Sequence, residues 1–182
     1  MIEVEVKLPL YRRSLTEKAL VEQGFEAGDL IRESDLYFNS DFHDFIKSDE
    51  ALRVRTSENL TRRTVDSTLT FKGKKMDSVS MTRRELETRV EDGKATVEIF
   101  KALGYTSLFS VNKLRQIYRK DDVTACVDQV EGLGSFLELE IIVEDENRRE
   151  EALCRIKTIL KEIGSDISET TRRSYLSMLM KL

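Results

Sequence analysis

Apolar and charged residues alternate strictly in the first stretch of this chain. Residues 2–8 read Ile-Glu-Val-Glu-Val-Lys-Leu. In an extended strand Glu3, Glu5 and Lys7 project from one face and the aliphatic residues from the other. The two carboxylates lie about 7 Å apart and repel each other unless a cation sits between them. The pattern therefore predicts a strand with one charged face. We expect Pro9 to end this strand.

A second strand of the same design occurs far along the chain. Residues 136–142 read Phe-Leu-Glu-Leu-Glu-Ile-Ile and place Glu138 and Glu140 on one face. If this strand came close to the first, the two acidic faces would form an oxygen-rich site of the kind that hard divalent cations prefer. The simpler interpretation of either strand alone is a half-buried strand whose charged face is solvated.

The same alternation predicts several further strands, over residues 30–38, 51–55, 68–74, 81–90, 113–118 and 123–130. Apolar spacing of three and four residues predicts four helices, over residues 15–23, 94–103, 148–163 and 174–182. We expect Ser14 to cap the first helix and Gly24 to end it, and Asp145 and Asn147 to cap the third. Residues 39–50 are predicted to form a loop or short helix.

Charge of both signs on at least seven strands favours a closed or nearly closed antiparallel barrel with a polar interior. The predicted fold class is α+β, a closed eight-stranded barrel with helices packed outside. The reverse orientation, with charges facing water, is not excluded by periodicity. The chain has one proline and no linker-like stretch, so residues 1–182 are predicted to form a single domain.

Composition excludes several classes of function. Of 182 residues 40% are hydrophobic and 35% charged, and 30 basic residues are set against 34 acidic ones, a net charge of −4. This balance argues against nucleic-acid binding through bulk positive charge. One histidine and two cysteines disfavour a zinc site, a disulfide framework and a serine triad. The sequence carries no signal peptide or long apolar run, which predicts a cytoplasmic protein without a membrane partner.

A barrel interior built from these strands would be crowded with ions. Its basic residues would be Lys7, Arg53, Arg55, Lys72, Lys113 and Arg115, and its acidic residues Glu3, Glu5, Glu85, Glu87, Asp128, Glu138 and Glu140. Such an interior requires internal pairing or a charged ligand. A polyphosphate with Mg²⁺ or Mn²⁺ matches both sets. No Walker loop is present, so side chains would have to build the phosphate site.

These residues also resemble a known family, the CYTH superfamily of triphosphate tunnel metalloenzymes, and within it the class IV adenylyl cyclase type. The resemblance lies in Glu-x-Glu-x-Lys at residues 3–7, Ala-Leu-Arg-Val-Arg at 51–55 and Thr-Phe-Lys-Gly at 70–73. It continues through Arg-Glu-Leu-Glu at 84–87, Lys-x-Arg at 113–115, Val-Asp at 127–128, Gly-Leu-Gly at 132–134 and Phe-Leu-Glu-Leu-Glu at 136–140. It extends to about residue 175, where Arg173-Ser174-Tyr175 fits as well.

The resemblance implies an eight-stranded antiparallel tunnel that binds a triphosphate end-on, with two positions for divalent metal ions. The metal ligands it implies are Glu3, Glu5, Glu138 and Glu140. The triphosphate-binding residues it implies are Lys7, Arg53, Arg55, Lys72, Lys113, Arg115, Glu85 and Glu87. The catalytic set it implies is Glu3, Glu5, Glu138, Asp128, Lys113 and Arg115. Asp128, Glu85 and Glu87 would position metal, water or basic partners.

Several activities fit such a tunnel. The first is an adenylyl cyclase that converts ATP to 3′,5′-cyclic AMP and pyrophosphate. The second is a triphosphatase acting on inorganic or organic triphosphate. A non-catalytic polyphosphate- or nucleotide-binding module and a purely structural barrel with internally paired charges stay open. A homodimer is compatible with the barrel, although no apolar stripe marks an interface.

A few residues outside these sets receive simpler interpretations. Asp35 and Tyr37 are weaker candidates for the site, because a strand tyrosine usually serves packing. We expect His43 to be a surface residue and Cys126 and Cys154 to be buried as small apolar residues. Five basic residues are predicted to be loop charges that attract an anion towards the tunnel mouth: Arg62, Arg63, Lys74, Lys75 and Arg83.

Overall fold

Eight strands form a closed antiparallel barrel in the computed structural model, which describes residues 2–181. Their order around the barrel is β1-β5-β4-β3-β2-β6-β7-β8. The strands are β1 (Ile2–Leu10), β2 (Glu26–Asn39), β3 (Ala51–Asn59), β4 (Thr64–Lys72), β5 (Arg83–Val90), β6 (Thr106–Lys120), β7 (Val123–Val130) and β8 (Gly134–Val143). The predicted fold class is thus confirmed. Six strands are longer than the sequence pattern predicts, above all β2 and β6, which pair along most of their length. β7 has the predicted bounds, and β5 begins two residues later than predicted.

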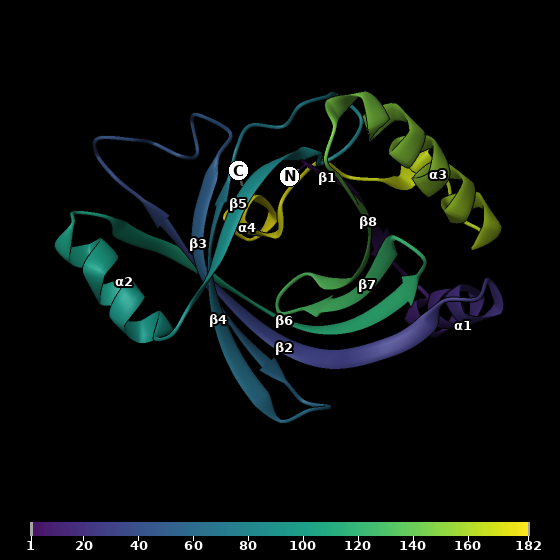
Figure 1. Ribbon diagram of the computed structural model, residues 1–182, viewed down its shortest axis with the longest axis horizontal. Helices are drawn as coiled ribbons and strands as arrows, with labels where there is room; N and C mark the ends of the chain where they lie inside the picture. Colours follow the sequence, from purple (N-terminus) through teal and green to yellow (C-terminus); the bar gives the residue numbers. More distant parts are fainter. Residues whose placement is uncertain (1, 182) are drawn as a thin grey trace.

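The two acidic strands are neighbours. In the register of β1 against β8, Glu5 faces Glu140 and Lys7 faces Glu138. Pairing of β1 with β5 is limited to Ile2 and Glu3, so most of the other edge of β1 has no strand beside it. Figure 1 shows the resulting ring of strands seen end-on.

Pro9 lies inside β1 rather than at its end, contrary to the sequence-based expectation. The carbonyls of Glu5 and Lys7 accept hydrogen bonds from Met81 N (2.9 Å) and Thr171 N (2.7 Å), which are not strand residues of the barrel. The backbone polar groups of odd-numbered residues in β1 therefore point away from β8. Pro9 follows the same alternation, so its missing N–H removes no bond from the β1–β8 ladder.

Helices cover the outside of the barrel and one end of its interior. They are α1 (Arg13–Glu22), α2 (Gly93–Ala102), α3 (Arg149–Glu162) and α4 (Tyr175–Leu179), with short 3₁₀ turns η1 (Glu146–Arg148) and η2 (Ile167–Glu169). In Figure 1, α1 and α3 lie on one side of the ring, α2 on the opposite side, and α4 appears within the ring. Leu182, at the end of the fourth predicted helix, lies outside the described residues.

Two of the predicted helix caps need comment. Ser14 does not cap α1: Arg12 occupies the cap position and provides no side-chain hydrogen bond. Asp145 does act as a cap, but for η1, where its side chain accepts from Asn147 N at 3.0 Å. The expected glycine end of α1 is present, since Gly24 has a φ of +87°.

The main hydrophobic core lies between the barrel wall and two helices. The aliphatic face of β1 packs with outward residues of β7 and β8 and with the buried stripe of α3, including Ile156 and Leu160. Leu20 of α1 joins the same cluster. This packing leaves the charged faces of the strands inside the barrel, so the alternative with charges facing water is wrong for β1, β7 and β8. No helix within residues 2–181 is long and apolar enough to cross a membrane.

Candidate active site

The barrel encloses a cavity of about 740 Å³. With the exception of Asp128, every residue that the sequence analysis places in the site lines it: Glu3, Glu5, Lys7, Arg53, Arg55, Lys72, Glu85, Glu87, Lys113, Arg115, Glu138 and Glu140. Residues far apart in the chain thus meet in one chamber because the barrel closes between β1 and β8. Asp128 is fully buried behind this wall, where it supports other side chains.

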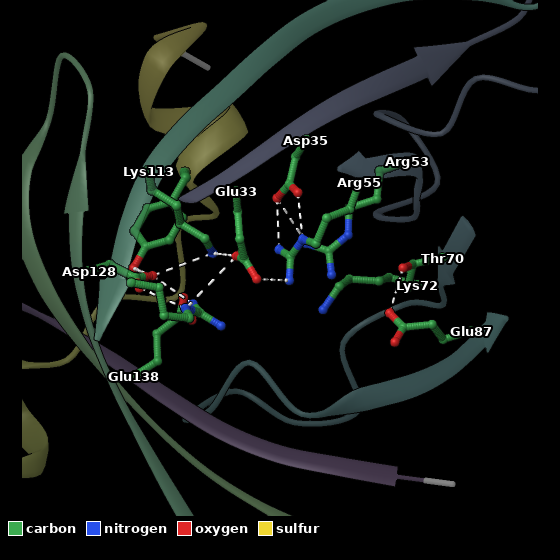
Figure 2. A network of polar contacts seen from close by, with 12 residues as sticks. Glu33, Asp35, Arg53, Arg55, Thr70, Lys72, Glu87, Lys113, Asp128 and Glu138 are labelled. Atoms are coloured by element: carbon green, nitrogen blue, oxygen red, sulfur yellow. Dashed lines mark hydrogen bonds and ion pairs between the residues drawn. The ribbon is translucent and has the colours of Figure 1, made fainter. Parts of the chain in front are cut away.

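Two arginines on β3 are held by a buried aspartate on β2. Arg55 donates to both carboxylate oxygens of Asp35, from Nε at 2.6 Å and from Nη2 at 2.8 Å, and Arg53 donates from Nη1 at 3.1 Å. Figure 2 shows Asp35 above the two guanidinium groups. Burial alone would raise the pKa of Asp35, but Arg55 and Arg53 hold it well below its usual range. The weaker candidate Asp35 is therefore a central part of the arginine cluster.

Glu33, also on β2, links this cluster to β6. It accepts from Arg55 Nη1 at 3.0 Å, and Lys113 Nζ lies 3.1 Å from its other oxygen. Burial acts to raise its pKa, yet Arg55 and Lys113 lower the pKa of Glu33 to about 2. The sequence analysis missed Glu33. The signal was available, since Glu33 stands two residues before Asp35 and so on the same strand face.

Arg115 is the hub of the opposite half of the network. Its guanidinium donates to both oxygens of Asp128, at 2.7 and 2.6 Å, and to Glu138. Lys7 Nζ lies 3.1 Å from the other oxygen of Glu138. Although burial opposes it, Lys7 and Arg115 hold the pKa of Glu138 well below its usual range. Glu138 is therefore an ionised acceptor between two cations, and it lies close to Asp128 in Figure 2.

The remaining contacts of the site come from β4 and β5. Lys72 Nζ lies 2.5 Å from Glu85 Oε1. Thr70 donates a hydrogen bond from its hydroxyl to Glu87 Oε2 at 2.7 Å (Figure 2). Both glutamates face the cavity, in agreement with the alternation that the sequence shows on β5. Of these two glutamates, Glu85 pairs with a cation, whereas Glu87 accepts from a neutral hydroxyl.

Three carboxylates at the β1–β8 side have the opposite electrostatic character. Burial and the neighbouring Glu3 raise the pKa of Glu140 to about 8. Burial, followed by the charge of Glu138, raises the pKa of Glu5. Burial also raises the pKa of Glu3, although Lys72 opposes this. The ionised forms of these groups lack enough positive charge around them.

This acidic group has the donor chemistry of a divalent cation site. Glu5 Oε1 is buried without a hydrogen-bond partner among the described residues, and Lys7 Nζ is 3.7 Å away. Carboxylate oxygens are the ligands that Mg²⁺ and Mn²⁺ accept, and a cation would relieve the mutual repulsion. Within residues 2–181 no three acidic, cysteine or histidine side chains are already arranged around one point as a metal centre. The residues fit a metal chemically, and ligation by them stays a prediction.

Two simpler interpretations from the sequence are wrong. Arg83 is the first residue of β5 and is buried against the cavity rather than exposed on a loop, because β5 starts at the level of Glu3. Cys154 is exposed on α3, since it falls outside the helix's apolar stripe. Cys126 is buried as expected, and burial raises the pKa of its thiol. His43 is exposed, with Nε2 2.6 Å from Glu50.

The fold and site together define a closed antiparallel barrel whose interior holds a dense, largely paired set of cations and carboxylates. The family model of the CYTH domain matches residues 1–175. A "putative adenylate cyclase" of Methanocaldococcus jannaschii is 37% identical over 178 residues, which cover 98% of both chains. The chain therefore belongs to the CYTH family.

Solved structures agree with this assignment. A protein from Pyrococcus horikoshii has a TM-score of 0.89 and 34% identity, with 98% of each chain covered. A Hippeastrum protein has a TM-score of 0.68 and 19% identity, with 99% of this chain and 95% of that chain covered. At that identity the second likeness concerns the fold alone.

Proposed function

We propose that this protein is a metal-dependent enzyme that acts on a nucleoside triphosphate bound inside the barrel, converting ATP to 3′,5′-cyclic AMP and pyrophosphate. The observation that carries the proposal is the set of cations lining one cavity from four strands: Lys7, Arg53, Arg55, Lys72, Lys113 and Arg115. Guanidinium and ammonium groups in a water-poor chamber bind phosphate oxygens strongly.

The arginines on β3 are suited to orient the phosphate chain. Asp35 fixes Arg53 and Arg55 by three hydrogen bonds, so neither arginine has to lose rotamer freedom when the ligand binds. Arg115 is fixed in the same way by Asp128. These contacts support a preorganised electrostatic site for the negative charge of the phosphates.

The acidic residues would hold the metal. Glu3, Glu5, Glu138 and Glu140 would bind Mg²⁺ or Mn²⁺, supported by the unpartnered oxygen of Glu5 and the raised pKa of Glu140. When bound, such an ion neutralises charge on the leaving group and lowers the pKa of the attacking hydroxyl. In the cyclase reaction the ribose O3′ forms a bond to the α-phosphorus, the bond from that phosphorus to the pyrophosphate oxygen breaks, and the hydroxyl proton is released.

The cavity also supports an organic rather than an inorganic triphosphate. Its volume of about 740 Å³ falls in the range of sites for ligands of nucleotide size. Apolar side chains from three segments line it beside the charges: Ile46, Met81 and Leu176. Inorganic triphosphate has no apolar surface to pack against these side chains, whereas a nucleobase does. The name of the Methanocaldococcus relative supports the same activity.

A triphosphatase is the second candidate. The strongest contacts of the site involve charged groups that a phosphate chain alone would satisfy, and none of them requires a base. The Hippeastrum protein of the same fold is described as having a dominant triphosphatase activity. In that reaction the attacking group is water, not the ribose hydroxyl. Water forms a bond to the terminal phosphorus, the bond from that phosphorus to the bridging oxygen breaks, and orthophosphate and a diphosphate are released.

Product analysis separates the candidates. Purified protein is incubated with ATP or inorganic triphosphate under Mg²⁺ or Mn²⁺, beside Arg53→Gln and the control Lys18→Gln, which removes an exposed charge on α1. Cyclic AMP with equimolar pyrophosphate, lost in Arg53→Gln and kept in Lys18→Gln, supports the cyclase. Orthophosphate without cyclic AMP establishes the triphosphatase. Metal-dependent binding without any product refutes both and leaves a binding module, and the absence of binding leaves a structural barrel.

A further inference from the structure

The C-terminal helix α4 places a tyrosine inside the charged chamber. Tyr175 is the first residue of α4, is 6% exposed and lines the cavity. Its ring packs edge-on against Phe136 at 5.1 Å between centroids, within a cluster that includes Val111 and Val130. Ser174 caps the helix by accepting from Ser177 N at 3.0 Å. The position of the ring is therefore fixed by packing and by the cap.

From this position Tyr175 contacts three groups of the proposed site. Lys7 Nζ lies over its ring, 4.1 Å from the centroid, and Lys113 Nζ lies 5.3 Å from it. Its hydroxyl donates to Asp128 Oδ2 at 3.0 Å. The ring face is negative and attracts both ammonium groups. Burial raises the pKa of Tyr175, so the hydroxyl keeps the proton that it donates.

We infer that Tyr175 is a positioning residue for the phosphate-binding lysines, which makes the C-terminal helix a component of the site. A lysine ammonium on a four-carbon stem has many rotamers, and β1 and β6 are not neighbours in the barrel. One aromatic ring contacts both ammonium groups and so links two lysines from separate strands. The hydroxyl of Tyr175 fixes the Asp128 carboxylate by a hydrogen bond, and Asp128 in turn orients Arg115.

This role differs from that of a simple hydrophobic plug. A plug could be any side chain of similar volume, whereas positioning depends on the ring face. The inference rests on the proposed function for its consequence, the binding of a triphosphate, but the lysine geometry can be measured in the free protein. The positioning role of Tyr175 can therefore be refuted without refuting the proposed function.

The test compares Tyr175→Phe, which keeps the ring, with Tyr175→Leu, which removes it. Leu179→Ala is the matched control, because Leu179 packs α4 against Gly132 and is not among the residues that line the cavity. NMR of the lysine ε-methylene groups measures the ring-current shift that an overlying ring produces. Calorimetry with inorganic triphosphate and Mg²⁺ measures affinity, and steady-state kinetics separate KM from kcat.

We expect two upfield-shifted lysine signals in the wild type and in Tyr175→Phe, and their loss in Tyr175→Leu. Triphosphate affinity should fall about tenfold in Tyr175→Leu, as an increase in KM with kcat changed much less. Tyr175→Phe should stay within about threefold, and Leu179→Ala should lower the melting temperature while it keeps both signals and affinity.

Other results overturn the inference. The absence of shifted signals in the wild type contradicts the geometry itself. Shifted signals with equal affinity in Tyr175→Leu and wild type contradict the positioning role alone and leave the proposed function intact. Shifted signals without triphosphate binding by the wild type refute the proposed function, and the positioning role with it. Equal losses in Leu179→Ala and Tyr175→Leu would show that α4 acts only as a plug.

Discussion

Asp35→Asn is the substitution that tests the arginine cluster most directly. Asp35 is 1% exposed and is the shared acceptor of three hydrogen bonds from Arg53 and Arg55. Asparagine keeps the shape but removes the charge, so two buried guanidinium groups lose their common counter-ion. Breaking a buried ion pair in this way costs about 3–5 kcal/mol.

The expected effect on thermal stability follows from chain length. For a domain of this size 1 kcal/mol corresponds to roughly 2–4 °C in melting temperature, so the substitution should lower it by about 6–20 °C. The lower end is more fitting, because the side-chain carbonyl of the introduced asparagine can still accept from one arginine. Differential scanning calorimetry and urea unfolding measure the change. Glu58→Gln, which disrupts an exposed pair with Arg32, is the control and should leave stability nearly unchanged.

Binding of inorganic triphosphate provides a second test of the Asp35→Asn prediction. If the arginines face the phosphate site, inorganic triphosphate should replace the missing negative charge. It should then stabilise Asp35→Asn by more degrees than it stabilises the wild type. A melting temperature within about 2 °C of wild type would refute the ion-pair argument. A large loss of stability with no greater response to triphosphate would refute the assignment of these arginines to the ligand.

Two further predictions concern the acidic side of the chamber. Because the pKa of Glu140 is about 8 in the folded protein and ordinary in the unfolded chain, the native state binds a proton that the unfolded state releases, and stability falls as pH rises from about 4.5 to 8. Glu140→Gln should flatten this fall in melting curves measured across that window; parallel curves for the two proteins would contradict it. Saturating Mg²⁺ or Mn²⁺ should raise the melting temperature of the wild type, because a hundredfold excess over Kd adds about 2.7 kcal/mol to the free energy of unfolding. Glu5→Gln should reduce this response and a chelator should abolish turnover, whereas an equal metal response in both proteins would exclude Glu5 as a ligand.

Much of the fold could be predicted from the sequence. Alternation with a period of two is a local property, so residues 2–8 and 136–142 had to be strands with paired acids wherever they lay. The ordered motifs from Glu3 to Glu140 indicated the CYTH family, and with it the closed barrel. Twelve of the residues that line the cavity were predicted because they occupy the charged face of a predicted strand.

Other features depended on the neighbours that the tertiary structure provides. Pro9 stays in β1 because its nitrogen faces an edge without a strand, and Arg83 is buried because β5 begins beside Glu3. Neither fact is encoded near the residue itself. The prediction that Ser14 caps helix α1 was wrong for the same reason. The helix already begins at Arg13, close to the point where the chain leaves β1.

The electrostatic character of each charge was decided only by barrel closure. Glu138 and Glu140 are two residues apart on one strand, yet the pKa of the first is lowered by Lys7 and Arg115 while that of the second is raised by burial and Glu3. Alternation placed both on the same face, but it carries no information on which cations lie across the chamber. Tyr175 shows the same limit, because its contacts with Lys7 and Lys113 arise from a helix docked from the far end of the chain. Periodicity specifies which face a residue occupies, and only long-range packing specifies what that face meets.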